Sequence, residues 1–356
     1  MKLSAEVLRL RIPRRDPGAP PMETVILRLT AGDGTVAIGE SVGARAFHGM
    51  DAETIARELR EIVLPALDAE EPPVSILQRL SPPARCALDV ALHDLRGREQ
   101  GLRIADLLGG PRRSRVAVNA LLPLSSEAAM LEVAREAWKR GVGTFKIKSA
   151  SLAEDVEALH TLRRVFGPRA RLRLDANGAW TPGEAIERIR MIEPLGLEYI
   201  EQPVARGHLD EMAWVAAGSG IPIAADEDAT DPAAIGRIAA ARAASIIVVK
   251  LPTAGGIGGA MAVLRAAAEK GLGAVVTGMV DTSVGIAAAL HVAAAADALA
   301  GACGFGTLDL LTRDVVAEPL RIENGAMLLP GGPGLGVQLD PRALARLRAA
   351  AQRKMT

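Results

Sequence analysis

Cysteine is scarce in this chain of 356 residues. Only Cys86 and Cys303 occur, which are too few for a disulfide framework and are not in a metal-binding spacing, so we expect a reducing, cytoplasmic compartment. An excess of charge of either sign is also absent, because 42 Lys and Arg residues balance 42 Asp and Glu residues. That balance offers no general attraction to nucleic acid or to an anionic membrane, so we expect a small-molecule partner.

Long apolar segments are missing as well. The N-terminal residues 1–16 contain no continuous apolar region of the kind found in signal peptides, and no apolar run reaches the roughly 20 residues of a membrane helix. The longest alanine-rich stretch, residues 285–300, is interrupted by His291 and Asp297 and is typical of a buried helix. The sequence therefore predicts no membrane segment.

A regular alternation of short apolar runs and helical patterns begins near residue 116. Eight runs resemble strands, and their starts lie 24 to 28 residues apart, about the length that one strand, one helix and two loops require. This alternation is typical of parallel βα units, and eight of them favour closure into a barrel over an open sheet. The expected strands begin at Val116, Thr144, Leu172, Glu198, Pro222, Ile246, Ala274 and Ala302.

The chain on either side of this region has a different pattern. Residues 1–112 contain two strand-like runs, joined by the proline-rich loop 14–22 and followed by helices, which predicts an α+β domain. We place the barrel at residues 113–312 and expect residues 313–356 to pack back on the first domain. The expected fold class is thus α/β, a (βα) barrel with a separate N-terminal domain.

Charged residues stand where the expected barrel strands end. Three successive strands end in Asp175, Glu201 and Asp226, and the strands before and after them end in Lys148 and Lys250. These side chains should converge, because the C-terminal strand ends of such barrels face the active site. Three carboxylates repel one another unless a cation lies between them, and oxygen ligands favour Mg²⁺, with Mn²⁺ as a substitute. A structural network of lysine–carboxylate pairs is the alternative.

The lysines complement the carboxylates. Lys146 and Lys148 are two residues apart on one strand, so their side chains leave the same face. A neighbouring cation and a metal ion would disfavour the ammonium form, so Lys148 could serve as a base, with Lys250 facing it across the site and Lys146 acting electrostatically. A metal with two opposed lysines suits abstraction of a weakly acidic proton beside a carboxylate.

Several motifs together resemble the enolase superfamily and, within it, the muconate lactonizing enzyme subgroup. They are FKIK at 145–148, LRLDANGAW at 172–180, EYIEQP at 198–203, IAADED at 223–228 and the stretches 248–260 and 87–110. The resemblance implies a modified TIM barrel (β7α7β-like) with an N-terminal capping domain and a symmetric homo-oligomer. It also implies Mg²⁺ held by the three carboxylates, Lys148 and Lys250 as the acid/base pair, and Asn177 and Glu227 as supporting residues.

The reaction within this subgroup stays open. Dipeptide epimerases of the subgroup usually carry Asp-x-Asp on strand eight, where this chain has Gly304, Phe305 and Gly306. Residues 280–290 and 302–320 resemble some o-succinylbenzoate synthases instead. We therefore place o-succinylbenzoate synthase-like dehydration first, epimerisation or racemisation of dipeptides or N-succinyl amino acids second, and muconate cycloisomerisation third.

Substrate choice is expected to depend on the loops at 14–22 and 43–50. A Schiff-base aldolase that needs no metal and a catalytically silent binding protein are the alternatives of other classes, and the full set of charged strand ends disfavours the second. For the arginines, solvated surface charge is the alternative to contact with a second substrate carboxylate. The candidate substrate contacts are Arg14, Arg15, Arg45, His48, Gly278, Gly304 and Gly306.

Overall fold

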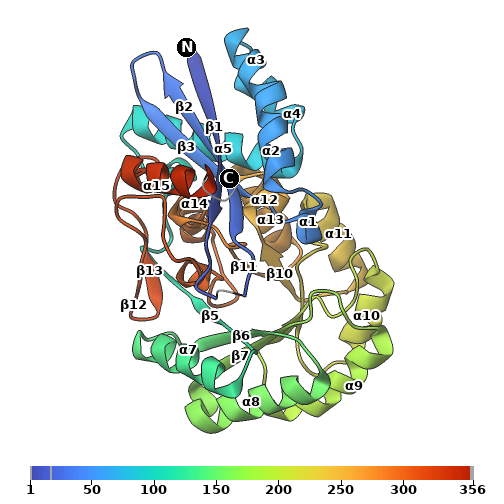
Figure 1. Cartoon of the computed structure of the whole chain (residues 1–356). Coiled ribbons are helices and arrows are strands. Elements are labelled where there is room, and N and C mark those ends of the chain that lie inside the picture. The colour runs from blue at the N-terminus through green and yellow to red at the C-terminus, as the bar shows by residue number, and fades with distance from the viewer. Residues whose placement is uncertain (1, 17, 353–356) are drawn as a thin grey trace.

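The computed structural model describes residues 2–16 and 18–352, with the side chains of 348–352 left out. Position 17, within the loop 14–22, therefore lies outside the described residues. Figure 1 shows two parts, an N-terminal sheet with helices at the top and a ring of strands and helices below it. The C-terminal segment returns to the upper part. We keep the boundaries expected from the sequence as a proposal for how these parts divide into domains.

The upper part is built on a three-stranded antiparallel sheet in the order β1-β2-β3. The second strand-like run of the sequence is divided by a turn, where Gly34 adopts a φ of 88° that favours glycine. Gly39 allows a helix to pack closely on the sheet, because a Cβ at this position would lie 2.0 Å from the Ala87 carbonyl oxygen. The strands are β1 (Leu3–Ile12), β2 (Met22–Ala31) and β3 (Val36–Val42).

Short helices and one long helix complete this part. The helix α5 packs along β3 and begins at Ser81, whose hydroxyl accepts a hydrogen bond from the Ala84 N–H. Its C-terminal glycine, Gly101, is left-handed. The helices are α1 (Arg45–His48), α2 (Ala52–Glu58), α3 (Leu64–Asp68), α4 (Pro73–Gln78), α5 (Pro82–Gln100) and α6 (Ile104–Leu107), with a π-helical turn at Leu59–Val63.

The lower part contains seven parallel strands in the chain order expected from the sequence. Each strand is hydrogen-bonded in parallel to the next along the chain. Their C-terminal ends therefore meet at one edge, which positions the charged strand ends near one another. The strands are β5 (Asn119–Leu122), β6 (Thr144–Lys148), β7 (Arg171–Asp175), β8 (Tyr199–Glu201), β9 (Ile223–Ala225), β10 (Ile246–Val249) and β11 (Gly273–Val276).

The expected eighth strand is reduced to single bridges. Cys303 bridges Val118 and Gly304 bridges Thr277, both in parallel, and these contacts join β11 to the chain just before β5. Glycine weakens a strand and often marks a close approach between segments. At Gly304 the approach is to Thr277, because a Cβ would lie 1.9 Å from the Thr277 Oγ1 atom. The ring of strands is thus closed, although the prediction of a full strand here was wrong.

Helices cover the outside of the ring. Their starts follow local capping chemistry, because Ser151, Thr181 and Asp231 each accept a hydrogen bond from the third residue of the helix that follows. The helix expected from Ser125 is capped one residue later, by Ser126. The helices are α7 (Glu127–Lys139), α8 (Leu152–Phe166), α9 (Pro182–Ile192), α10 (Leu209–Ala217), α11 (Pro232–Ala241), α12 (Leu251–Ala254), α13 (Ile257–Glu269) and α14 (Ser283–Ala295).

The C-terminal segment connects the two parts. The first expected barrel run, at Val116, is split: β4 (Arg115–Ala117) pairs with β13 (Ala326–Leu328), which pairs with β12 (Ile322–Glu323), and only β5 joins the ring. Further on, the Leu335 N–H donates to Asp94 of α5, and α15 (Pro341–Gln352) contacts β1.

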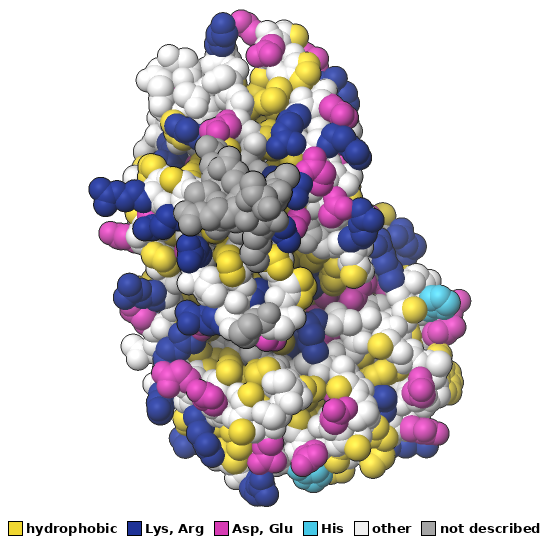
Figure 2. All heavy atoms as spheres, viewed as in Figure 1, with side chains coloured by type: hydrophobic (Ala, Val, Ile, Leu, Met, Phe, Trp, Pro, Cys, Tyr) yellow, Lys and Arg dark blue, Asp and Glu magenta, His cyan; other side chains and the backbone are white. Residues whose placement is uncertain are grey.

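The surface shows no segregation of charge on the face in Figure 2, where Lys and Arg side chains are intermingled with Asp and Glu. Among the described residues, no helix is long and apolar enough to cross a membrane.

Candidate active site

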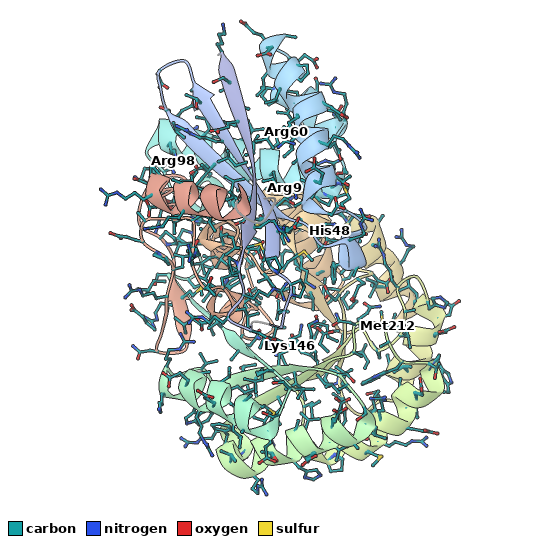
Figure 3. All side chains as sticks on the ribbon, in the orientation of Figure 1. Arg9, His48, Arg60, Arg98, Lys146 and Met212 are labelled. Atoms are coloured by element: carbon teal, nitrogen blue, oxygen red, sulfur yellow. The ribbon has the colours of Figure 1, made fainter. Side chains whose placement is uncertain are left out.

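A cavity of about 750 Å³ lies between the C-terminal ends of the barrel strands and the capping part. Its barrel side includes the strand-end residues Lys146, Lys148, Asp175 and Lys250, and its capping side includes α1 and the loop 14–22. Figure 3 shows Lys146 within the ring and His48 on the capping part above it. The cavity therefore lies where the sequence predicts the chemistry.

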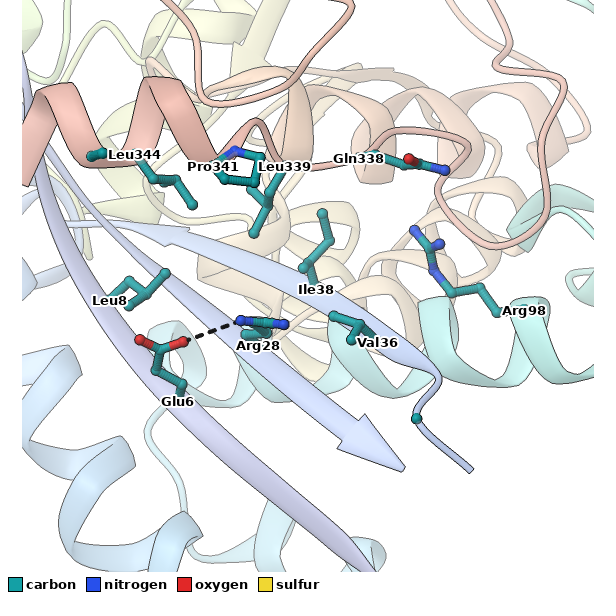
Figure 4. Close-up of a pocket in the computed structure, with 12 residues that line it drawn as sticks. Glu6, Leu8, Arg28, Val36, Ile38, Arg98, Gln338, Leu339, Pro341 and Leu344 are labelled. Atoms are coloured by element: carbon teal, nitrogen blue, oxygen red, sulfur yellow. Dashed lines mark ion pairs between the residues drawn. The ribbon is translucent and has the colours of Figure 1, made fainter. Parts of the chain in front are cut away.

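A second cavity, of about 600 Å³, lies between the capping sheet and the C-terminal segment (Figure 4). Its charged side chains have protein partners. Arg28 pairs with Glu6 at 3.6 Å, and Arg98 is bound to Asp94 and to the Val337 carbonyl. This cavity lacks the converging strand ends of the first, so we take the first as the candidate active site.

Lys146 lies between two of the predicted metal ligands. Its Nζ atom is 2.7 Å from Oε1 of Glu201 and 2.9 Å from Oδ2 of Asp175. Burial disfavours its ammonium form, but the two carboxylates outweigh burial and hold the pKa of Lys146 well above its usual value. This arrangement favours the ammonium form of Lys146, and its electrostatic role stays a prediction.

The other two lysines differ in exposure. The Lys148 side chain is 55% exposed, lies 3.4 Å from Oδ2 of Asp175 and donates a hydrogen bond to Asn177. The Lys250 side chain is only 9% exposed and pairs with Asp226. The two ammonium groups thus contact different carboxylates, on strands β7 and β9, with Glu201 of β8 between these strands.

The carboxylates lie in a buried electrostatic network. Burial and the charge of Asp175 raise the pKa of Glu201 to about 7, and burial raises the pKa of Asp226 and of Glu227 above their usual values. Although burial opposes ionisation, the neighbouring lysines hold the pKa of Asp175 below its usual value. Burial therefore opposes the ionised forms of Glu201 and Asp226, even though a lysine contacts each of them.

The donor set fits a divalent cation in chemical type. Oδ1 of Asp226 and Oε2 of Glu227 are buried oxygens without a hydrogen-bond partner, and carboxylate oxygens are the ligands that Mg²⁺ prefers. As the side chains stand, no three acidic, histidine or cysteine groups among the described residues are arranged to hold an ion. The reason is local, since lysine ammonium groups contact all three predicted ligands.

Gln202 organises the site, although no role for it was predicted from the sequence. Its Oε1 accepts from the Asp226 N–H at 3.0 Å and its Nε2 donates to Asp228 at 2.8 Å. Its backbone has a φ of 39°, which is costly for a glutamine, and Asn177, at φ 45°, is left-handed after the preceding strand. Asn177 also donates to Glu227 at 3.2 Å, so both residues orient carboxylates.

Phe47 was also missed. It belongs to the capping helix α1, lines the cavity, and places its ring centroid 3.9 Å from Nζ of Lys250. This is a cation–π contact between the two parts of the molecule. An aromatic residue in a short helix gives no signal in the sequence that it will meet a residue some 200 positions later.

The three predicted glycine contacts all line the cavity. A Cβ on Gly306 would lie 2.4 Å from the Asn119 carbonyl oxygen, and a Cβ on Gly278 would lie 2.7 Å from Oδ2 of Asp281. With the crowding already described at Gly304, these positions exclude side chains. The wall here is therefore backbone.

The four candidate contacts of the capping part separate into two groups. Arg14 and Arg45 line the cavity. Arg15 is exposed and is not part of the wall. His48 is not part of it either, because its Nε2 atom faces the Val42 carbonyl at 3.0 Å, and burial lowers its pKa.

Comparison with known proteins agrees with this architecture. The family model described as enolase C-terminal domain-like matches residues 129–343, and that of the mandelate racemase/muconate lactonizing enzyme N-terminal domain matches residues 21–109. A chloromuconate cycloisomerase of Pseudomonas putida is 32% identical over 90% of both chains. An o-succinylbenzoate synthase of Thermobifida fusca (strain YX) is 42% identical over 61% of this chain and 67% of its own.

A solved structure is also similar to this chain in fold and in sequence. The L-Ala-D/L-Glu epimerase of Bacillus subtilis superposes with a TM-score of 0.87 at 30% identity, covering 95% of this chain and 99% of that one. The family matches, the relatives and the curled parallel sheet agree with the resemblance found in the motifs. This chain belongs to the muconate lactonizing enzyme subgroup of the enolase superfamily and is an enzyme of its isomerase and lyase class.

Proposed function

We propose that the enzyme removes the proton α to a substrate carboxylate with the help of Mg²⁺, and that its reaction is a dehydration of the o-succinylbenzoate synthase type. The observation that carries the proposal is the arrangement of Asp175, Glu201 and Asp226 on adjacent strands, with Lys148 and Lys250 bound to the outer two. Enzymes of this subgroup generally depend on a divalent metal ion.

Each side chain has a distinct role in this proposal. Asp175, Glu201 and Asp226 would hold Mg²⁺, which supplies positive charge where the substrate carboxylate gains negative charge. Lys148 is the most exposed of the three lysines and contacts the cavity, so its amine takes the α-proton. Lys250 and Lys146 contribute fixed positive charge, and Gln202 holds the backbone of Asp226 in place.

Dehydration requires the same base to act twice. After Lys148 takes the α-proton, its ammonium returns that proton to the hydroxyl on the adjacent carbon, and the C–O bond breaks to release water. The α-proton and the hydroxyl must then lie on the same side of the substrate. The 42% identity to an o-succinylbenzoate synthase supports this reaction.

Epimerisation is the second candidate, because lysines that bind opposite ends of the carboxylate row could serve the two faces of one carbon. The backbone wall at Gly304 and Gly306 argues against a dipeptide, since no acidic side chain there can bind a substrate ammonium. Cycloisomerisation, suggested by the chloromuconate cycloisomerase relative, is the third.

The test is turnover of the Mg²⁺-loaded enzyme in D₂O with the o-succinylbenzoate precursor, N-succinyl amino acids, dipeptides and cis,cis-muconate, followed by NMR and mass spectrometry. We expect dehydration of the precursor, and a loss of about 10²-fold or more in kcat for Lys148→Ala. Chelation should abolish turnover. Deuterium entering an amino acid derivative with inversion would replace this proposal with epimerisation, and turnover that survives both chelation and Lys148→Ala would refute the mechanism.

A further inference from the structure

The capping side of the cavity contains three arginines with different surroundings. Arg11 pairs with Glu23 at 2.9 Å, and Arg45 pairs with Asp51. Arg14 forms no side-chain hydrogen bond or ion pair with any described residue, and its Nε atom is buried without a partner. A guanidinium on the cavity wall without an acidic partner is costly to leave unpaired, so Arg14, unlike Arg11 and Arg45, can bind an anion that enters the cavity.

A second polar group of the same wall is also unsatisfied. Thr307, in the 3-10 turn Gly306–Leu310, is 8% exposed, and its Oγ1 atom is buried without a hydrogen-bond partner. Like Arg14, it lines the cavity. Arg14 and Thr307 therefore both line the cavity, and each has a polar group that no described residue satisfies.

The backbone fixes these two groups relative to each other. Arg14 forms an antiparallel bridge with Leu311, and the Arg15 N–H donates to the Leu310 carbonyl at 2.8 Å. Thr312 donates from both its N–H and its hydroxyl to the Pro13 carbonyl, each at 3.0 Å. The loop 14–22 is thus joined at its start to the end of the turn that contains Thr307, which preorganises the wall.

We propose that Arg14 and Thr307 form an anion subsite that selects substrates with a second carboxylate. The first carboxylate would lie at the strand ends near Lys148 and Lys250, and the second at the wall where the loop 14–22 meets the 3-10 turn. The assignment rests on the proposed function only in taking this cavity as the place where substrate binds. The sequence offers Arg14, Arg15 and Arg45 as contacts for a second substrate carboxylate, and the proposed subsite uses only Arg14 of these three.

The charge of the cavity supports an anionic occupant on this side. Six cationic side chains and three carboxylates line it, and the carboxylates of the capping side, Glu23 and Asp51, are already paired with arginines. A second carboxylate on the substrate would meet an unneutralised guanidinium. An ammonium at the same place would meet Arg14 with no acid to offset it.

Binding of matched ligands to the intact Mg²⁺-loaded enzyme tests the subsite without requiring turnover. The probes are glutarate against pentanoate and adipate against hexanoate, measured by calorimetry. We expect each dicarboxylate to bind about tenfold or more tightly than its partner, as a charge-assisted hydrogen bond predicts. Arg14→Gln should abolish this preference, Arg14→Lys should retain part of it, and Thr307→Val should weaken it.

Arg11→Gln and Arg45→Gln are the matched controls, since both remove an arginine of the same wall that already has an acidic partner. Both should keep the preference. The subsite is refuted if the wild-type enzyme shows no preference, if Arg14→Gln keeps it, or if Arg45→Gln loses it equally. Lys148→Ala should keep the preference while losing turnover, so failure of the proposed reaction and failure of the subsite give different results.

Discussion

Gln202 illustrates how single residues support this site at a local cost. Its left-handed backbone is unfavourable for a side chain of this size, and it persists because hydrogen bonds of its backbone and of its side-chain amide hold it. Its N–H donates to the Ala224 carbonyl at 2.8 Å, and its amide binds the Val204 carbonyl, Asp228 and the Asp226 N–H. Since it follows Glu201 directly and bonds to Asp226, this residue couples two of the proposed ligands.

We predict that Gln202→Ala lowers the free energy of unfolding by about 2 kcal/mol or more. The substitution removes one hydrogen-bond partner from the buried Asp226 N–H and one from the Asp228 carboxylate. Urea denaturation measures this change. The control is Gln338→Ala, an exposed glutamine, which should change stability by no more than about 0.5 kcal/mol. Equal effects of the two substitutions would show that the amide network contributes nothing.

The site residues that could be predicted from the sequence are charged residues at the ends of apolar strands. Lys148, Asp175 and Glu201 could be predicted because charged residues are rare at the ends of apolar strands. Gln202 and Phe47 could not, because their importance comes from a backbone angle and from a contact between distant segments. The orphan Nε of Arg14 distinguished it from Arg45 only once the ion pairs were known.

At the scale of elements, the start of α14 joins three regions of the chain. Glu40 of β3, which is buried, accepts from the Thr282 hydroxyl at 2.6 Å, the Thr282 N–H at 3.2 Å and the Gly285 N–H at 2.7 Å. Asp314 accepts from both the hydroxyl and the N–H of Ser283. Acidic groups at a helix N-terminus are favourable, so the capping part and the C-terminal segment both bind the barrel here.

Glu40 should make stability depend on pH. Burial and the charge of Asp281 raise its pKa to about 7, from an ordinary value of 4.5. Because the folded state then binds a proton that the unfolded state has released, stability should fall as pH rises from about 4.5 to 7, by up to about 3 kcal/mol. Asp281, whose pKa burial raises to about 6, acts in the same direction.

The substitution Glu40→Gln tests this assignment, with urea midpoints measured from pH 5 to pH 8 in the presence of Mg²⁺. We expect lower stability at pH 5, because the amide offers one acceptor fewer to Thr282 and Gly285, and a smaller decline as pH rises. Glu187→Gln, an exposed change on α9, should leave the profile as it is. If the stability of Glu40→Gln declines with rising pH as much as that of the wild type, other carboxyl groups cause the decline.

Elements were predicted best where their signals are local. The helices after Ser151, Thr181 and Asp231 begin where the caps predicted. The prediction of an eighth strand was wrong because the close packing of Gly304 against the Thr277 side chain is a tertiary constraint that an apolar pattern does not reveal. The run at Val116 divides between two sheets for the same reason, since its first half pairs with a C-terminal strand more than 200 residues later.

At the scale of the whole molecule, one buried apolar cluster spans the capping part and the barrel, beside a second cluster within the capping part. A single cluster of buried apolar side chains includes Leu8, Ile12 and Met22 of the capping sheet together with Phe145 and Ile247 of the barrel. The cavity lies between the parts that this core joins. Ion binding at the strand ends should therefore stabilise the protein as a unit rather than one part of it.

This reasoning predicts that Mg²⁺ raises the melting temperature, in a single transition and in proportion to the logarithm of its concentration. An ion that binds only the folded state adds about 2.7 kcal/mol at a hundred times its dissociation constant. The physical source is the buried carboxylate cluster, where the pKa of Glu201 is raised to about 7 by burial and by the charge of Asp175. A cation among these groups removes that repulsion.

Asp226→Asn should largely abolish the rise, because it removes one ligand charge and leaves Lys250 without its acidic partner. Asp309→Asn is the matched control, since that carboxylate is half exposed, pairs with Arg140 and does not line the cavity. A rise of equal size in both variants would place the ion elsewhere. A melting curve that resolves into two transitions, of which Mg²⁺ shifts only one, would show instead that the shared core does not make the two parts one cooperative unit.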